Sequence, residues 1–390
     1  MEEWKEYRLG DVCTISSSKR IFANEYQKAG IPFYRGKEII EKQNGTSISN
    51  ELFISEERFN EIKSKYGVPK EGDMLLSSVG TLGVPYIVHD ETFYFKDGNL
   101  TWFYDYKNIN NYFLYYWFLS PKARFLIDTK AIGSTQKALT IETLKKFEIL
   151  LPSEEIQNRI VAILKSLDDK IEVNRRINEN LEQQAQALFK SWLKDCEDEV
   201  TIGDLSLNIT DYTKCEQKQV VLINSSDVTE GRFDHHNLSE NKNLKGHFKK
   251  RFLKGDILYS QVRPRNRHWG YCTFNADNYL ASTQLMVIRN KKEIIPSILL
   301  YQYLIDNNVW MDFTLRTETR SGTFPQGNYE DLSAIKVPFD TNVKEISDNL
   351  ENIYSLIYKN VESSRRLASL RDTLLPKLMS GELRVGDVGR

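Results

Sequence analysis

Three short sequence patterns occur once in each half of this chain and in the same order, and this repetition is the feature that most constrains the fold. The pairs are Leu-Gly-Asp-Val (9–12) with Ile-Gly-Asp-Leu (202–205), Gly-Asp-Met-Leu-Leu-Ser (72–77) with Gly-Asp-Ile-Leu-Tyr-Ser (255–260), and Glu-Ile to Arg-Arg-Ile (155–177) with Glu-Ile to Arg-Arg-Leu (345–367). Their separations of 193, 183 and 190 residues lie near half of the 390-residue length. Solenoid repeats are far shorter. We therefore predict a tandem pair of domain-sized units.

Each unit is predicted to consist of a globule followed by a long helix. Residues 1–151 and 196–340 are rich in aromatic and β-branched residues separated by Gly, Asn and Asp turns, which favours mixed α/β globules. Residues 152–195 contain no Gly, and their apolar residues recur at helical spacing from 156 to 192. Residues 341–390 repeat this helical pattern and add a tail.

A helix of about 40 residues is roughly 60 Å long and needs a partner to cover its apolar stripe. We expect the first helix to begin after Ser153 as its N-cap, and the second to be interrupted at Pro376 and closed by Gly381. The stripe has coiled-coil spacing, and Asn174 and Asn178 near the seam either fix the register or lie at solvated edges. The predicted fold class is α+β: two similar mixed α/β globules, separated by two long antiparallel helices in a coiled-coil-like rod, with an internal pseudo-two-fold repeat.

The composition fits a folded intracellular chain but does not decide what it binds. There are 53 basic and 54 acidic residues, so the net charge of -1 neither requires nor excludes a nucleic acid, because local clustering of charge decides binding. The four cysteines are scattered without a zinc-type or disulfide-type spacing. The acidic start lacks a signal-peptide core, and no apolar run reaches the roughly 20 residues of a membrane span. We expect a cytoplasmic protein without a membrane partner.

Nothing in the sequence predicts catalysis. The chain has no Asn/Asp-Pro-Pro-Tyr/Phe motif of an adenine methyltransferase and no nucleotide-binding Gly-Lys-Ser/Thr ending. His235, His236 and His247 have no further ligand cluster beside them, so we expect surface histidines and no metal site. Two similar but divergent globules at a fixed separation suit the reading of two features of one extended partner, and B-DNA, with a groove repeat of about 34 Å, is the obvious candidate.

The helical segments resemble the specificity subunits of type I restriction-modification systems. The resemblance rests on residues 151–164, 167–171 and 187–192, on Leu-Leu-Pro-Lys-Leu-Met-Ser-Gly-Glu-Leu at 374–383, and on Tyr-Arg-Leu-Gly-Asp-Val at 7–12. It implies a non-catalytic subunit whose globules are target-recognition domains, each reading one half of an interrupted site in double-stranded DNA. It also implies helices that set the spacer and dock two methyltransferase (M) subunits, with restriction (R) subunits joining them. S-adenosylmethionine, ATP and Mg would then belong to those partners, and this chain would hold no cofactor.

Candidate DNA contacts are polar and basic residues in loops that follow predicted strands. In the second globule they are Gln261, Arg263, Arg265, Asn266 and Arg267, and then Arg320 and Thr323; in the first they are Ser134, Gln136 and Lys137, in the place corresponding to the 320s loop, and Arg35 and Lys37. A solvated basic loop is the alternative for the residues at 261–267, and Arg35 could instead pair with Glu38 or another neighbour. Lys249, Lys250 and Arg251 are interpreted as phosphate contacts or plain surface.

Two other functions stay open at this stage. One is a structural adaptor whose two globules bind proteins. The other is an independent DNA enzyme with an unfamiliar site.

Overall fold

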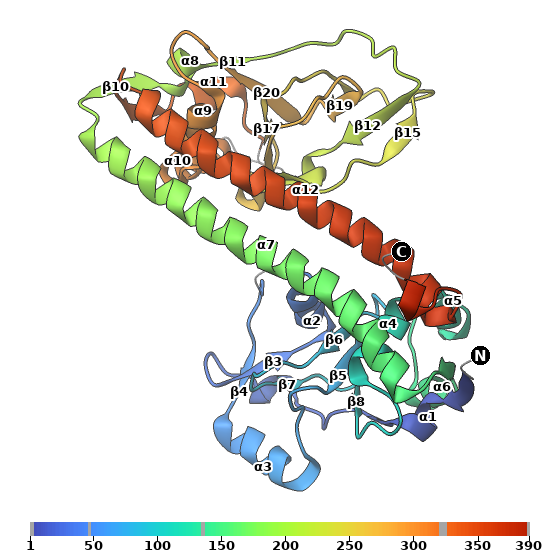
Figure 1. Cartoon of the computed structure of the whole chain (residues 1–390). Helices are drawn as coiled ribbons and strands as arrows, with labels where there is room; N and C mark the ends of the chain where they lie inside the picture. The colour runs from blue at the N-terminus through green and yellow to red at the C-terminus, as the bar shows by residue number, and fades with distance from the viewer. Residues whose placement is uncertain (1–3, 46–47, 134–136, 320–325, 388–390) are drawn as a thin grey trace. The chain divides into compact units, whose positions relative to one another are not determined.

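The computed structural model describes residues 4–45, 48–133, 137–319 and 326–387, and it divides into two compact units. Unit 1 consists of residues 1–172 and 364–390, and unit 2 of residues 173–363. Each long helix therefore contributes one part to each unit (Figure 1). The finer boundaries predicted at 151, 195 and 340 stay predictions.

Unit 1 is built on a four-stranded sheet, a three-stranded sheet and a separate strand pair. The four-stranded sheet has the order β2 (Thr14–Ser16), β8 (Leu100–Tyr104), β5 (Met74–Ser77), β6 (Pro85–Ile87); the three-stranded sheet has the order β4 (Phe53–Ile54), β3 (Ile31–Tyr34), β7 (Tyr94–Phe95); and β1 (Lys5–Arg8) pairs with β9 (Glu148–Leu151). The helices are α1 (Leu9–Val12), α2 (Gly36–Gln43), α3 (Glu56–Tyr66), α4 (Asn111–Leu119), α5 (Pro121–Lys130) and α6 (Ile141–Lys145).

Unit 2 has a similar plan, with two four-stranded sheets and two strand pairs. One sheet has the order β11 (Ser206–Asn208), β20 (Leu285–Asn290), β17 (Ile257–Ser260), β18 (Trp269–Tyr271); another has the order β15 (Leu238–Glu240), β12 (Gln219–Ile223), β19 (Tyr279–Ser282), β16 (Phe248–Lys250); β13 (Val228–Thr229) pairs with β14 (Arg232–Phe233), and β10 (Asp198–Thr201) with β21 (Lys336–Phe339). The helices are α8 (Ile202–Leu205), α9 (Ser297–Ile305), α10 (Asn307–Thr319) and α11 (Tyr329–Ser333). In both units one pair of strands is parallel, β3 with β7 and β12 with β19.

The predicted repeat is confirmed at the level of single hydrogen bonds. In unit 1 the Gly72 N–H donates to the carbonyl of Val88 (2.9 Å), and the Val88 N–H donates back to Asp73 (2.8 Å). In unit 2 the Gly255 N–H donates to the carbonyl of Cys272 (2.7 Å), and the Cys272 N–H donates back to the carbonyl of Asp256 (2.9 Å). Both glycines have positive φ, +86° and +92°, which only glycine adopts readily. The two Gly-Asp turns therefore start β5 and β17 in the same way.

The two long helices pack together, as the fold class predicts. α7 (Glu154–Asp195, 42 residues) begins directly after Ser153, and α12 (Lys344–Ser380, 37 residues) ends before Gly381, whose φ is +76°. The predicted interruption at Pro376 is wrong, since the helix continues through it. Pro removes only one N–H donor and needs a local adjustment, so a helix packed on the core of unit 1 through Leu375 and Leu378 tolerates it.

The contacts inside unit 2 show that the helices run antiparallel there, and one further contact joins them in unit 1. In unit 2 the Asn178 side chain contacts Ile357, donating to its carbonyl (3.4 Å), and accepts from the Asn360 Nδ2 (2.9 Å), while the more N-terminal Asn174 donates to the carbonyl of Asn360 (3.5 Å). In unit 1 the Arg371 Nη1 donates to an Asp168 oxygen (2.6 Å). The two asparagines thus lie at the helix seam, and their role in fixing the register stays a prediction.

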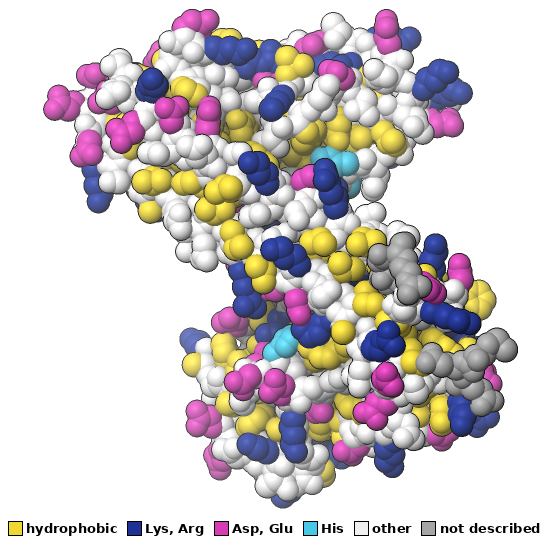
Figure 2. All heavy atoms as spheres, viewed as in Figure 1, with side chains coloured by type: hydrophobic (Ala, Val, Ile, Leu, Met, Phe, Trp, Pro, Cys, Tyr) yellow, Lys and Arg dark blue, Asp and Glu magenta, His cyan; other side chains and the backbone are white. Residues whose placement is uncertain are grey.

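Large apolar side chains remain exposed on both long helices. They are Val173, Ile177 and Leu188 on α7 and Leu356, Val361 and Leu370 on α12. Figure 2 shows apolar side chains among charged ones along α7. Within the described residues no helix is both long enough and apolar enough to span a membrane.

Candidate nucleic-acid interface

The loops that follow β5 and β17 occupy equivalent places in the two units, and each pairs with a segment just before the last short helix. In unit 1 the Leu139 N–H donates to the carbonyl of Ser78 (2.9 Å), and residues 79 and 138 form an isolated bridge. In unit 2 the Gly327 N–H donates to the carbonyl of Gln261 (2.8 Å), and residues 262 and 326 form the matching bridge. We call these the unit 1 loop pair (78–83 with 137–139) and the unit 2 loop pair (261–268 with 326–327).

The scaffold is therefore the same in the two loop pairs while the side chains differ. The unit 1 loop carries Ser-Val-Gly-Thr-Leu-Gly at 78–83, and the unit 2 loop carries Gln-Val-Arg-Pro-Arg-Asn-Arg-His at 261–268. The sequence predicts that the 133–137 segment corresponds to the 320s loop. The residues that follow these two segments, 138–139 and 326–327, pair with the loops after β5 and β17 in the same way.

The arginine loop of unit 2, residues 263–267, has an unusual backbone. Pro264–Asn266 form one 3-10 turn, and both flanking residues, Arg263 (φ +49°) and Arg267 (φ +53°), are left-handed although neither is glycine. Such conformations cost on the order of 1 kcal/mol or more and persist where surrounding contacts impose them. The Trp310 indole of α10 supplies one such contact by donating to the carbonyl of Pro264 (2.9 Å).

Arg265 and Arg267 have partners on α10. Arg265 donates from Nε (2.5 Å) and Nη2 (2.8 Å) to the two carboxylate oxygens of Glu318, and these hydrogen bonds raise the pKa of the arginine and lower the pKa of Glu318. Arg267 lies over the Trp310 ring at 4.2 Å and donates to the side chain of Asn307 (3.2 Å). The side chain of Arg265 is still 73% exposed.

The other predicted residues of unit 2 lie in different surroundings. Arg263 and Asn266 are exposed, and the half-buried Gln261 donates its N–H to the carbonyl of Gln284 (2.9 Å). Arg320 and Thr323 lie outside the described residues.

In unit 1 the start of α2 lies beside the loop pair, because Asn99 contacts both. Its carbonyl accepts from the Ser78 N–H (2.8 Å) and lies 3.9 Å from the place that a Cβ on Gly36 would take. Lys37 on this helix is exposed, with Glu41 at 3.6 Å, and Lys137 in the loop pair is exposed. Ser134 and Gln136, also predicted to contact DNA, are outside the described residues.

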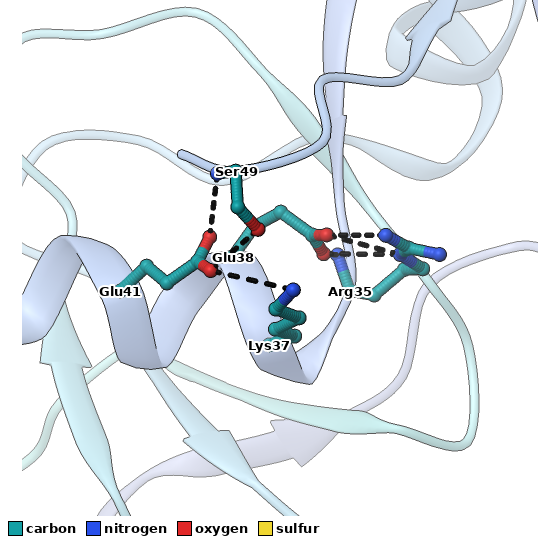
Figure 3. Close-up of polar contacts among 5 residues, drawn as sticks. All are labelled: Arg35, Lys37, Glu38, Glu41 and Ser49. Atoms are coloured by element: carbon teal, nitrogen blue, oxygen red, sulfur yellow. Dashed lines mark hydrogen bonds and ion pairs between the residues drawn. The ribbon is translucent and has the colours of Figure 1, made fainter. Parts of the chain in front are cut away.

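Arg35 forms the ion pair with Glu38 that was the alternative to a DNA contact. Its Nη2 lies 2.5 Å from one carboxylate oxygen of Glu38, whose side chain is fully buried, and its backbone N–H donates to the other oxygen (2.8 Å; Figure 3). Burial opposes ionisation of Glu38, but the hydrogen bonds from Arg35 outweigh it and lower the pKa of Glu38. Arg35 therefore fixes the start of α2. On the next turn of this helix, the carboxylate of Glu41 accepts a hydrogen bond from the Ser49 hydroxyl (2.7 Å).

The basic cluster at residues 249–251 includes one buried side chain. The ammonium group of Lys250 is buried and donates to the carbonyl of Leu285 (2.7 Å), and burial lowers the pKa of Lys250. Its interpretation as a phosphate contact or surface residue is wrong. Lys249 lies over the Tyr212 ring (4.8 Å), and Arg251 donates to the carbonyl of Asp277 (2.8 Å).

Sequence reasoning missed the α10 residues that hold the arginine loop. Trp310 and Glu318 are 46 and 53 residues from their partners, and no local pattern links such distant positions. His236 is also more enclosed than the surface histidine we expected, with its Nδ1 2.5 Å from the Tyr279 hydroxyl. Among the residues that the structure describes, no three His, Cys, Asp or Glu side chains are grouped to hold a metal ion.

Comparisons with known proteins agree on one family. A family model described as "Type I restriction modification DNA specificity domain" matches residues 1–183. The chain is 34% identical over 181 residues to the Type I restriction enzyme HindI specificity subunit of Haemophilus influenzae, covering 45% of this chain and 39% of that protein. It is 23% identical to the Type I restriction enzyme MjaIX specificity subunit of Methanocaldococcus jannaschii over 99% of this chain and 95% of that protein.

The fold is similar to that of the crystal structure of a type I restriction-modification system S subunit from M. genitalium, with a TM-score of 0.56, 16% identity, and coverage of 97% of this chain and 96% of that one. Residues 1–183 thus match the type I DNA specificity domain, and over nearly its whole length the chain is similar to a type I specificity subunit. The alignments to the HindI subunit and to a second H. influenzae relative each span 39% of the relative's length.

Proposed function

We propose that this chain is the non-catalytic DNA-specificity subunit of a type I restriction-modification complex, and that each unit reads one half of an interrupted site. The observation that carries the proposal is the repeated loop pair: Ser78 with Leu139 and Gln261 with Gly327 make the same backbone bond, while the neighbouring side chains differ. A shared scaffold with divergent side chains suits two half-sites of different sequence, because base edges are read by side-chain hydrogen bonds.

The proposed contacts in unit 2 are the arginine loop with Gln261, together with Arg320 and Thr323. In unit 1 they are Lys37 and Lys137, with Ser134 and Gln136. Arg35 would act there by holding the start of α2 through Glu38. A net charge of -1 is compatible with this function, because acidic residues elsewhere on the surface offset a basic DNA-facing surface without neutralising it.

The long helices are proposed to set the unread spacer and to dock two methyltransferase subunits, which restriction subunits then join. The exposed apolar residues on α7 and α12 support docking, since such side chains commonly mark protein interfaces. S-adenosylmethionine, ATP and Mg would be used by those partners in the cytoplasm. The chain itself would hold none of them.

Co-expression with the cognate methyltransferase subunit tests the proposal directly. Methylated adenines would be mapped at base resolution in a host without other DNA methylation. We expect methylation in an interrupted two-part motif that disappears when this chain is omitted. A correctly assembled complex that methylates no such motif would contradict the proposal and favour an adaptor whose globules bind proteins. Methylation or cleavage by the purified chain alone would contradict its non-catalytic role.

A second test addresses the arginine loop. Replacing Arg263, Arg265 and Arg267 together by Gln should abolish tight DNA binding by the assembled complex while its thermal unfolding stays close to that of the wild type. Each lost phosphate contact should also lower the slope of log affinity against log salt by about 0.9. Binding that is unchanged in both affinity and salt dependence would remove this loop from the interface.

A further inference from the structure

The Arg265 side chain combines high exposure with a fixed orientation. The side chain is 73% exposed, yet two of its N–H groups are bound by the carboxylate of Glu318, whose side chain is 28% exposed. A long side chain that is this exposed ordinarily samples many rotamers, and ordering it costs about 1.5 to 2 kcal/mol. The two parallel hydrogen bonds provide that ordering before any ligand is bound.

The geometry leaves a defined edge of the guanidinium available. Arginine has five N–H donors in a planar fork. The Nε hydrogen and one Nη2 hydrogen of Arg265 point at the two oxygens of Glu318. The remaining donors, on Nη1 and Nη2, therefore face away from Glu318 at the far end of the side chain. A pair of donors at the end of an arginine matches the O6 and N7 acceptors of guanine in the major groove.

The loop that carries Arg265 is held independently of this ion pair. The Trp310 indole binds the carbonyl of Pro264, and Arg267 lies over the same indole ring and binds Asn307. The two flanking arginines, Arg263 and Arg267, have a left-handed backbone, a conformation that persists where surrounding contacts hold it. Both the backbone and the guanidinium of Arg265 are thus positioned by one helix, α10.

We propose that Arg265 reads a guanine in the half-site of unit 2, and that Glu318 is its positioning residue. This inference rests on the proposed DNA-specificity function. Glu318 makes no contact with DNA in this scheme. It restricts Arg265 to the orientation in which the two outer donors meet one base, so it determines specificity more than affinity.

The Asp312–Arg316 pair on the same helix offers a matched control. Its Nε to Oδ1 distance is 2.7 Å, its charges equal those of the Arg265–Glu318 pair, and both side chains are about 40% exposed. The pair lies within one turn of α10, four residues apart, whereas Arg265 and Arg267 of the arginine loop bind Glu318 and Asn307. Removing its carboxylate changes the net charge as E318Q does, but leaves Arg265 supported.

The test uses the complex assembled from the wild type, E318Q, R265K or D312N chain with the cognate methyltransferase subunit. Motifs are determined by methylation mapping, and the affinity for the motif, for single-base variants of it and for unrelated DNA is measured at two salt concentrations. In E318Q and R265K, we expect discrimination in favour of one guanine in one half-site to fall by about tenfold or more, the size of one bidentate base contact. Other positions, unrelated DNA and D312N should change by less than about threefold, within the reach of surface charge effects.

Two outcomes would overturn the inference while leaving the proposed function intact. The first is a wild-type motif that E318Q and R265K both reproduce at every position. The second is an E318Q complex that binds all DNA more tightly, with a salt slope steeper by about 0.9, because Glu318 would then mask Arg265 from a phosphate. Absence of any interrupted motif with the wild type would instead overturn the proposed function itself. R265K keeps the charge and the loop contacts, so a folding defect in E318Q would not leave the inference without a test.

Discussion

Replacing Asp256 by Asn should destabilise unit 2 far more than the equivalent change destabilises unit 1. Asp256 is 1% exposed, and its carboxylate accepts from the Leu253 N–H and from the Nε and Nη2 of Arg289, all at 2.7 Å. Asparagine keeps the shape but removes the charge and one acceptor. Loss of one partner of a buried ion pair costs about 3 to 5 kcal/mol. Because the Arg289 side chain is 28% exposed and regains some hydration, we expect about 2 to 3 kcal/mol.

The equivalent residue in unit 1, Asp73, has only neutral donors. It accepts from the Lys70 N–H and the Trp102 indole, both at 2.9 Å, and burial raises the pKa of Asp73. The ionised form of this carboxyl is therefore disfavoured by folding. Asn keeps an acceptor for these donors without a buried charge, so D73N should change the stability by less than about 1 kcal/mol.

Hydrogen exchange of the full-length chain can measure the two units separately. D256N should speed exchange of the protected β17 and β20 amides by roughly 30- to 150-fold, which corresponds to about 2 to 3 kcal/mol. The β5 and β8 amides should be unchanged in D256N, and D73N should alter them by less than about fivefold. An equal loss of protection in both variants would refute the reasoning, since the shared turn and not the Arg289 ion pair would then account for the effect.

Three further predictions concern stability. The folded pKa of Glu38 lies below its unfolded value of about 4.3. The stabilisation that ionised Glu38 contributes is therefore present above that pH and is lost as the pH falls through the folded pKa. E38Q should remove this acid-dependent part of the free energy of unfolding, which urea unfolding between about pH 3 and 7 measures. Gly231 has a φ of +92°, and a Cβ there would lie 2.1 Å from the Tyr301 hydroxyl, so G231A should cost about 2 to 4 kcal/mol in the same assay, and a neutral effect would contradict the close approach. Arg371→Met breaks the 2.6 Å ion pair with Asp168, each 26% exposed, and should cost about 1 to 2 kcal/mol in unit 1 alone by hydrogen exchange.

The repeated architecture could be predicted because its signals are local. Gly-Asp followed at once by an apolar run predicts a turn that feeds a buried strand, and Gly72 and Gly255 indeed take positive φ at the starts of β5 and β17. The uninterrupted helical spacing after Ser153 likewise predicts α7, because side-chain period and helix geometry are linked residue by residue. Even the Arg35–Glu38 pair could be named as an alternative, since its partners are three residues apart.

Tertiary structure decided which side chains of the candidate interface meet. Lys250 reads as a surface residue in sequence, but the alternation of β16 places it on the buried side next to the exposed Lys249, where it meets the carbonyl of Leu285 on another strand. Arg265 reads as a basic loop residue, and only the return of α10 brings Glu318 to it across 53 positions. The sequence by itself determined the tandem repeat, its turns and its long helices, because spacing along the chain encodes them. The structure alone determined the partners of Lys250 and Arg265, because those depend on strand register and on the packing of segments far apart in the chain.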